Sequence, residues 1–319
     1  MSETIAAVVV TYNRKKLLHE CLDGILAQTR PVQGIILIDN ASTDGTPEML
    51  QEIGILDSAT PADSLQAEVD RTLRGRAKGD GDVKLHYLRL PINSGSSGGF
   101  HAGVKKGYDL GYDRLWMMDD DCLPEHSCLR ELMNPLRSDE VGAPWKLVTG
   151  TNTPVASSGT LPPGIFGKIP LYPLAFNGLL IGRLAIQKIG FPRREFFIDK
   201  DDSEYTTRAN EAGFKCHLVV EARLSHPDNP VAEINILGKK IRVVNYAKGD
   251  RIFFRIRNLL FLHRLHKTTY RTRTLLKAYS NEVLVLILKE FSLRRVWLFL
   301  KGLLIGTTAK LSVTSIEAD

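Results

Sequence analysis

The chain has 319 residues, of which 43% are hydrophobic and 24% are charged, so it can bury the core of one large domain. This balance excludes a mainly disordered protein, and 26 Gly and 15 Pro without a repeating period exclude a collagen-like one. The first apolar run has no basic residues before it and is too short for a signal peptide, which favours a buried strand. The four cysteines form no CxxC pair, which favours reduced thiols in a cytosolic protein.

Strands and helices alternate through the first half of the chain. Ile5–Thr11 and Gly34–Asp39 are unbroken apolar runs, typical of parallel strands that are buried on both faces. Lys15–Gln28, between them, repeats its apolar residues at the spacing of a helix. Further strands are expected at Leu85–Leu90 and Arg114–Met118, with a helix between them. This order predicts an α/β fold around a mostly parallel, Rossmann-like central sheet.

The middle of the chain contains shorter expected elements. A helix is expected near Ala62–Leu73, within a polar segment. Two short helices are predicted at Leu184–Ile189 and Asp201–Ala212, because a glycine follows each of them as a stop signal. A strand over His217–Val220 follows the second of these helices.

The chain changes character near residue 235, which divides a predicted catalytic domain (1–235) from a helical, basic C-terminal region (236–319). From Arg251 onward there are 13 Lys and Arg against 4 Asp and Glu, so this part carries +9 while the first 250 residues carry −3. Charges interrupt its apolar runs within 251–264 and 284–305, which favours amphipathic helices over membrane-spanning ones. These helices are expected on an anionic membrane surface, or packed against the first domain or a second subunit in a homo-oligomer.

Three consecutive carboxylates, Asp119, Asp120 and Asp121, follow the expected strand that ends in WMM. Adjacent carboxylates repel one another, and a divalent cation such as Mn²⁺ or Mg²⁺, which prefers oxygen ligands, removes that repulsion. Ligands of open α/β sheets bind at the carboxyl ends of strands, where this triplet falls. The alternative is a solvated acidic turn that caps the following helix.

A glycine-rich segment, Asn93–Phe100 (NSGSSGGF), joins an expected strand to an expected helix. Glycine allows backbone amides to approach a phosphate at a helix N-terminus. The segment satisfies neither the Walker A pattern nor GxGxxG, so an ordinary flexible loop is at least as good an interpretation.

Asp201, Asp202 and Glu204 begin an expected helix directly after an aromatic, apolar segment. Acidic residues commonly stand at helix N-termini, and Glu204 can pair with Arg208 one turn later. The apolar segment before them could instead desolvate one carboxylate so that it acts as a base. His226, in LSHPD, is interpreted as a structural residue unless it lies beside the aspartate triplet.

Taken in chain order, these motifs resemble those of family 2 nucleotide-sugar glycosyltransferases of the GT-A fold. The motifs are VVVTYNR, IDNASTDGT, NSGSSGGF, WMMDDD, FFIDKDDSEYTTR and LSH, and together they span residues 5 to about 228. The bacterial galactofuranosyl- and rhamnosyl-transferase branch is the most similar. The resemblance implies a GT-A fold, a nucleotide-sugar donor and a divalent cation.

The resemblance also implies roles for individual residues. Asp119, Asp121 and His226 would hold the metal, and Asp202 would be the catalytic base, with Asp201 and Glu204 in possible supporting roles. The implied nucleotide-sugar-binding residues are Thr11, Arg14, Asp39, Asn40, Asn93, Gly98, Asp119 and Asp120. The pair Asp39–Asn40 departs from the two adjacent acids of many relatives, which puts the identity of the nucleotide in doubt.

The expected function is metal-dependent, inverting transfer of a sugar to a hydroxyl of a surface polysaccharide or lipid-linked glycan. UDP-galactofuranose is the favoured donor, and dTDP-rhamnose is the alternative. The expected location is the cytoplasm, peripherally at the inner face of the cell membrane. A sugar-nucleotide pyrophosphorylase would need a long basic glycine-rich loop after the first strand, which TYNRKKLL lacks. A nucleic-acid-binding protein would need basic recognition elements in its core, but the first domain is acidic, so no nucleic-acid partner is expected.

Overall fold

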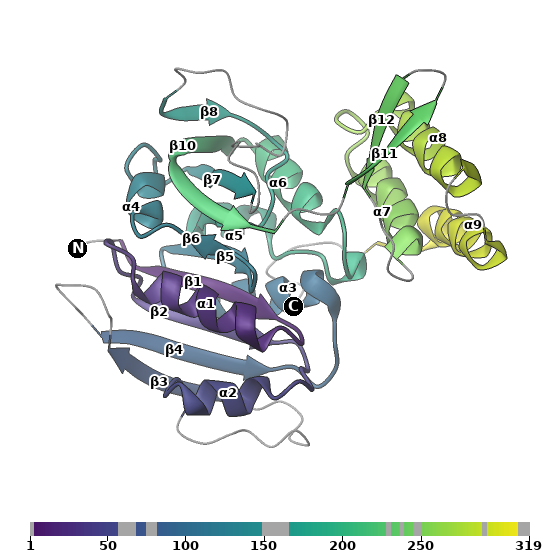
Figure 1. Ribbon diagram of the computed structural model, residues 1–319. Helices are drawn as coiled ribbons and strands as arrows, with labels where there is room; N and C mark the ends of the chain where they lie inside the picture. The colour runs from purple at the N-terminus through teal and green to yellow at the C-terminus, as the bar shows by residue number, and fades with distance from the viewer. Residues whose placement is uncertain are drawn as a thin grey trace.

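A computed structural model describes residues 3–56, 68–74, 82–148, 166–227, 231–236, 239–244, 251–288 and 292–311. A twisted central sheet has helices on both faces, and further helices follow it in the C-terminal region (Figure 1). The predicted α/β class, with a mostly parallel sheet and a helical C-terminal region, is confirmed.

The central sheet has the order β3-β4-β2-β1-β5-β9-β7-β10-β6. The strands β4, β2, β1 and β5 run parallel to one another, and β7 and β10 are parallel to each other. The short strand β9 is antiparallel to both β5 and β7, and β8 pairs with β10. The bounds are β1 (Ile5–Thr11), β2 (Gly34–Asp39), β3 (Glu68–Arg74), β4 (Asp82–Arg89), β5 (Arg114–Asp119), β6 (Leu123–Pro124), β7 (Glu140–Val148), β8 (Lys168–Pro170), β9 (Leu179–Gly182) and β10 (Lys215–His226).

Helices cover both faces of the sheet, and β1 supplies apolar side chains to each of them. Ile5, Ala7 and Val9 pack on one face with α1 (Lys15–Leu26), α2 (Thr46–Glu52) and α4 (Cys128–Met133). The alternate side chains of β1 pack on the other face with α3 (Gly95–Asp109), α5 (Arg183–Ile189) and α6 (Asp201–Glu211). Burial on both faces explains why β1 is apolar at every position rather than at every second one.

The glycine-rich segment is mostly helix rather than loop, because α3 already begins at Gly95. A Cβ atom on Gly99 or Gly103 would lie 2.4 Å from a methyl group of Val10 or Val8, respectively. Glycine at these positions therefore brings the helix backbone close to β1. The segment serves helix–sheet packing, which the sequence interpretation as a flexible loop missed.

The helix expected near Ala62–Leu73 is wrong over its described part, since Glu68–Arg74 forms the edge strand β3, antiparallel to β4. In the sequence EVDRTLR the two apolar residues, Val69 and Leu73, are an even number of positions apart, which is compatible with the period of a strand. Pairing with β4 supplies backbone hydrogen bonds along the whole segment. Residues 57–67, which include the start of the expected helix, lie outside the described residues.

The C-terminal region begins with the hairpin of β11 (Val231–Ile236) and β12 (Lys239–Val244), which contains the predicted boundary at residue 235. The helices α7 (Arg251–Leu265), α8 (Thr272–Leu288) and α9 (Leu293–Thr308) follow. The predicted amphipathic segment 284–305 contains the end of α8 and most of α9. α9 packs closely on α7, because a Cβ on Gly306 would lie 2.7 Å from Leu260. Within the described residues, no helix has the length and apolarity needed to cross a membrane.

Candidate active site

The aspartate triplet lies at the carboxyl end of β5, beside the end of β1, where Val10 pairs with Asp119. The Thr11 hydroxyl donates to Asp120 Oδ2 at 2.7 Å, and the Tyr12 amide contacts the same oxygen at 3.4 Å. Tyr12 is an exposed aromatic at this edge. Tyr12 belongs to the TYNR motif, but nothing in that motif indicates that its ring is exposed.

A guanidinium group partly neutralises the triplet. Arg14 Nη1 lies 2.6 Å from Asp121 Oδ2 and 3.2 Å from Asp120 Oδ1. Burial raises the pKa of Asp120 to about 6, despite the contacts with Arg14 and Thr11 that oppose the rise. Burial raises the pKa of Asp119 well above its usual range, and the charges of Asp121 and Asp120 add to this effect. The cluster therefore favours an added positive charge.

His226 does lie beside the triplet, as the metal interpretation requires. Its Nε2 is 3.1 Å from Asp121 Oδ1. Although burial opposes it, the contacts with His226 and Arg14 lower the pKa of Asp121, so this carboxylate is charged at neutral pH. Potential ligand atoms of Asp121, Cys122 and His226 all lie within 4.8 Å of one another.

This grouping fits a divalent cation in part. The carboxylate oxygen of Asp121 and the imidazole nitrogen of His226 are ligand types that suit Mn²⁺, and the Asp121 carboxylate is charged at neutral pH. Asp119, which the sequence places among the metal ligands, lies outside this group of ligand atoms in the described residues. Cys122, which the sequence interpretation did not consider, lies within it.

The residues at the end of β2 hold the adjacent loops together. Asp39 is completely buried and accepts hydrogen bonds from the Ser42 amide at 2.8 Å and the Tyr87 hydroxyl at 2.9 Å. Asn40 Nδ2 donates to Asn93 Oδ1 at 3.1 Å and to the Gly95 carbonyl at 2.9 Å. These predicted nucleotide-binding residues lie at the carboxyl edge of the sheet. Their polar atoms form hydrogen bonds with the neighbouring loops.

Gly98 lies in the first turns of α3, where it is packed against its own helix. A Cβ at this position would lie 2.3 Å from Ser94 Oγ. Ser94 in turn donates to Asn40 Oδ1 through its amide at 2.9 Å and its hydroxyl at 3.0 Å. Gly98 therefore makes room for the hydrogen bonds that join the start of α3 to the end of β2.

Asp201 and Asp202, the acidic pair, begin α6. Ser96 Oγ donates to Asp201 Oδ2 at 2.7 Å, and burial together with the Asp202 charge raises the pKa of Asp201 to about 7. Burial also raises the pKa of Asp202, while the Lys200 ammonium and the Ser203 amide favour its charged form. Asp202 is half-buried and Asp201 is buried.

Asp201, the first residue of the acidic pair, lies within electrostatic range of the aspartate triplet. The Asp201 charge contributes to the raised pKa of Asp119, which requires the two carboxyl groups to be near each other. The Asp201 hydrogen bond to Ser96 also ties the start of α6 to the start of α3. Two acidic clusters 80 residues apart in the sequence are thus brought to one place by β5, α3 and α6.

Glu204 is part of a buried ionic network. Its carboxylate lies 3.1 Å from Arg193 Nε and 3.0 Å from Arg208 Nη2, which confirms the pairing with Arg208 expected from the helical spacing. His266 Nε2, from the residues after α7, lies 3.5 Å away. Although burial alone would raise it, these partners lower the pKa of Glu204 to about 2. Through His266, Glu204 connects α6 to the C-terminal region.

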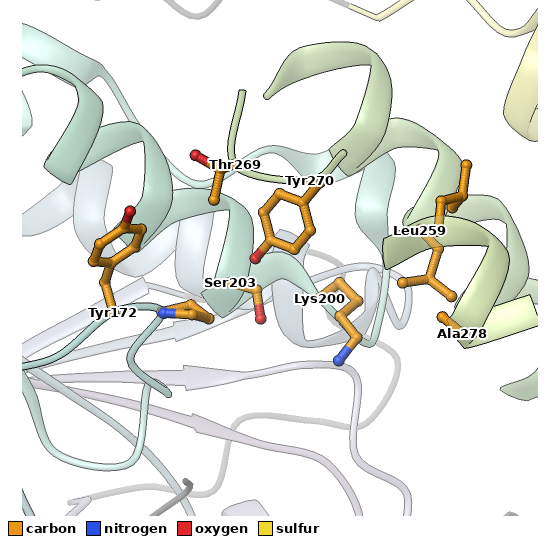
Figure 2. A pocket seen from close by; sticks show the side chains of 9 residues that line it. Tyr172, Lys200, Ser203, Leu259, Thr269, Tyr270 and Ala278 are labelled. Carbon is orange, nitrogen blue, oxygen red and sulfur yellow. The ribbon is translucent and has the colours of Figure 1, made fainter. Parts of the chain in front are cut away.

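A pocket of about 500 Å³ opens beside the acidic pair, between the catalytic domain and the C-terminal region. Figure 2 shows Tyr172, Lys200 and Ser203 on one side, with Tyr270, Leu259 and Ala278 on the other. The Asp202 charge contributes to the raised pKa of the Tyr270 hydroxyl, so the pocket lies close to this carboxylate. No local sequence motif predicts this pocket, because its lining residues come from separate segments at 172–173, 200–203 and 259–278.

Comparisons with known proteins show which family and fold this chain resembles. Residues 6–155 match the sequence profile described as Glycosyl transferase family 2. Galactofuranosyltransferase GlfT1 of Mycolicibacterium smegmatis is 26% identical over 289 residues, which cover 82% of this chain and 83% of that protein. GlfT1 of Mycobacterium tuberculosis is 24% identical over 242 residues, covering 71% of each chain.

Solved structures of S. aureus TarS share the fold. The 1–349 structure has a TM-score of 0.59 at 14% identity and covers 96% of this chain and 81% of that one. A longer TarS structure has a TM-score of 0.58, and this chain spans 48% of its length. TarS 1–349 is also known in complex with UDP, with a TM-score of 0.58 to this chain. The likeness at these identities is one of fold.

Proposed function

Because the chain belongs to glycosyl transferase family 2 and has the GT-A fold, we propose that it moves a sugar from a nucleotide diphosphate to an acceptor hydroxyl with inversion. The observation that carries this proposal is the aspartate triplet at the carboxyl end of β5, with Asp201 bonded to Ser96 of α3 and near enough to add to the raised pKa of Asp119. One cluster suits a donor diphosphate with its counter-cation, and the other suits a base. Both are needed for this reaction.

The donor lies along the ends of β1, β2 and β5 in this proposal. Thr11 and Arg14 orient Asp120, and Asn40 with Asn93 shapes the loop beside them. The exposed ring of Tyr12 offers a surface on which the nucleotide base can stack. Asp39 acts through the loop that it holds, since it is completely buried.

Asp121 and His226 would hold a divalent cation, either Mn²⁺ or Mg²⁺, with Asp119 beside them. When bound, such a cation stabilises negative charge on the leaving diphosphate. The chain itself contributes a charged Asp121, whose pKa is lowered by His226 and Arg14 even though burial opposes this. Arg14 adds a second positive charge at the same place.

The acceptor hydroxyl needs a base as its oxygen attacks the anomeric carbon of the donor. The new bond forms as the bond to the diphosphate oxygen breaks, and the hydroxyl proton passes to a carboxylate. We assign this role to Asp202, because burial raises its pKa, as suits a base, while the Lys200 ammonium and the Ser203 amide favour its charged form. Asp201, whose pKa is about 7, supports it and contacts Ser96.

The acceptor enters through the pocket beside Ser203 and Tyr270 in this proposal (Figure 2). Tyrosine rings provide apolar faces for sugar rings, and the lining hydroxyls of Ser203 and Thr269 can hydrogen-bond to sugar hydroxyls. A surface polysaccharide or a lipid-linked glycan is the acceptor class. The similarity to two galactofuranosyltransferases favours UDP-galactofuranose as the donor, with dTDP-rhamnose as the second candidate.

A donor panel tests this function. The purified chain with Mn²⁺ is mixed with UDP-galactofuranose, dTDP-rhamnose and UDP-N-acetylglucosamine, and both donor hydrolysis and the thermal midpoint are measured. We expect UDP-galactofuranose to raise the midpoint and to be hydrolysed, with less effect in EDTA. Asp121→Ala is the matched variant, which should lose the metal-dependent response. A panel without any response would contradict the proposal.

We place this activity at the cytoplasmic face of the cell membrane, where the C-terminal region contacts anionic lipid. The support is the apolar stripe on α9, where Leu293, Trp297, Leu300 and Leu304 are exposed. Basic residues alternate with this stripe, and α9 contains no acidic residue. An exposed apolar face with a basic border is typical of helices that lie on anionic membranes.

A further inference from the structure

The turn formed by residues 196–200, directly before the acidic pair, has an unusual backbone. Phe197 has φ 61° and ψ −65°, and Asp199 and Lys200 both have φ 70°. The Ile198 amide donates to the carbonyl two residues before it at 2.7 Å, which closes a strained γ-turn. Residues other than glycine keep such angles only where surrounding contacts hold them.

Asn258, on α7 of the C-terminal region, supplies several of these contacts. It is completely buried, and its Nδ2 donates to the carbonyl oxygens of the 196–200 turn. The distances are 2.9 Å to Phe196, 2.9 Å to Ile198 and 2.6 Å to Asp199. One amide nitrogen from outside the catalytic domain thus lies within hydrogen-bond distance of three of the turn's carbonyls, which share its two protons.

Arg257 extends the same set of contacts. Its Nη2 donates to the carbonyls of Glu195 at 2.6 Å and Phe196 at 2.7 Å, and its Nε donates to Asn258 Oδ1 at 2.9 Å. The last bond fixes the orientation of the amide, so that Nδ2 faces the turn. Phe197 stacks on Phe254 of α7, with ring centroids 4.8 Å apart and an 18° angle between the planes.

The start of α3 holds the opposite side of the turn. The Ser97 amide donates to the Phe197 carbonyl at 3.1 Å, and Ser96 Oγ donates to Asp201. A Cβ on Gly95 would lie 2.0 Å from the Phe197 carbonyl oxygen, so only glycine allows this approach. Together, α3 and α7 provide a hydrogen-bond donor for every carbonyl from residue 195 to residue 199.

We propose that Asn258, aligned by Arg257, is a positioning residue for sugar transfer: it holds the 196–200 turn and thereby fixes the place of the acidic pair that follows it at the start of α6. This inference rests on the proposed function. It makes α7 part of the catalytic unit, because removing the Asn258 amide takes the side-chain donor from the Ile198 and Asp199 carbonyls and loosens the strained turn, while the Phe196 carbonyl keeps Arg257. A displacement of about 1 Å at a reacting group can lower the rate roughly 100-fold.

The test compares three variants of the full chain. Asn258→Asp keeps the shape of the side chain but points an oxygen at three carbonyl oxygens, and Arg257→Lys keeps the charge but loses the planar fork. Arg264→Ala is the control, because Arg264 donates to the carbonyls of Gly306 and Ala309 in the C-terminal region, at 2.8 Å each. For each variant, kcat, both KM values and hydrogen exchange of the amides of 196–204 are measured.

We expect Asn258→Asp to lower kcat about 100-fold, with the donor KM nearly unchanged and faster exchange in 196–204. Arg257→Lys should act in the same direction and more weakly, and Arg264→Ala should keep both kcat and exchange near normal. Normal kcat and exchange in both folded test variants would overturn the proposal, as would an equal loss in the control. If the unaltered chain transfers no sugar, the proposed function fails, while hydrogen exchange still tests whether Asn258 holds the turn.

Discussion

Three acidic side chains within one turn of α6 have different surroundings and therefore different roles. Asp201 contacts Ser96 near the triplet, Asp202 contacts Ser203 near the pocket, and Glu204 is enclosed by two arginines. A helix N-terminus favours all three charges to a similar degree. Only the tertiary contacts distinguish a candidate base from a structural ion pair.

Replacement of the candidate base should affect turnover and spare binding. Asp202→Asn keeps the size of the side chain but cannot accept a proton, so we expect kcat to fall roughly 10²–10⁴-fold. Donor and metal affinity should survive, because they depend on the triplet and on the ends of β1 and β2. Steady-state kinetics and donor titration measure the two effects. Asp201→Asn is the control for position, and we expect it to cost less; normal turnover in Asp202→Asn would place the base elsewhere.

Replacement of Glu204 should affect stability instead. Glu204→Gln leaves buried positive charge on Arg193 and Arg208 without its counter-charge, and we expect a loss of about 3–5 kcal/mol in the free energy of unfolding. Because the folded-state pKa of Glu204 is lowered to about 2, its ionic contribution is present above pH 4.5 and is lost as the pH falls toward 2. Urea denaturation across this pH range measures it. Equal stability of the variant and the unaltered chain would contradict the network.

Sequence patterns indicated candidate site residues where the acidic residues are neighbours in the sequence. The aspartate triplet is contiguous in the sequence, so the repulsion between its carboxylates could be inferred without a fold. The acidic pair is also contiguous and follows an apolar segment, so the burial of one of its carboxylates could be inferred in the same way. Asp39 was different, since its partners Ser42 and Tyr87 come from a loop and from another strand. Its complete burial, which makes it a support for the loop, could not be read from the sequence.

At the scale of elements, the pattern was sufficient for buried strands and insufficient for edges. β1, β2 and β5 were predicted because burial on both faces requires unbroken apolar runs. The edge strand β3 has a polar sequence, and its partner β4 determines its structure. The glycine-rich start of α3 was interpreted as a flexible loop for a related reason. Its glycines are explained by the close approach of β1, which cannot be inferred from the sequence alone.

The helix α3 provides a prediction at this scale. Gly103→Ala places a methyl group 2.4 Å from Val8 Cγ1, and we expect this overpacking to cost about 1–3 kcal/mol in the free energy of unfolding. Urea denaturation of the variant measures the loss. Adding Val8→Ala removes the clashing methyl and should recover part of the stability that Gly103→Ala costs. Additive losses in the double variant would show that α3 does not rest on β1 at this contact.

At the scale of the whole molecule, the C-terminal region has two different sides. One side contacts the catalytic domain through Asn258 and His266 and lines the pocket with Tyr270. The other is the outer face of α9. From the sequence, this region was expected either to bind an anionic membrane surface or to pack against the first domain or a second subunit. The contacts of Asn258 and His266 pack this region against the catalytic domain, while large apolar side chains on the outer face of α9 are exposed.

The outer face of α9 has the properties of a membrane contact. Leu293 is 80% exposed, Trp297 55%, Leu300 57% and Leu304 63%, at a spacing that places them along one stripe of the helix. Lys301 Nζ lies 4.7 Å from the Trp297 ring centroid, beside the stripe. Leaving four large apolar side chains in water is unfavourable, and inserting them between lipid headgroups removes this cost. The basic residues add an attraction that is specific to anionic lipid.

Substitution of this stripe should therefore release the protein from anionic vesicles without affecting its fold. In co-sedimentation with phosphatidylglycerol vesicles, we expect the double variant Leu300→Glu/Leu304→Glu to bind much less than the unaltered chain, which itself should bind less at high salt and poorly to phosphatidylcholine. Leu184→Glu is the matched control, because Leu184 is 58% exposed on α5 of the catalytic domain. Equal binding of both variants would contradict a lipid contact at α9. A lipid-free dimer that the double variant abolishes would instead assign the stripe to a second copy of the chain.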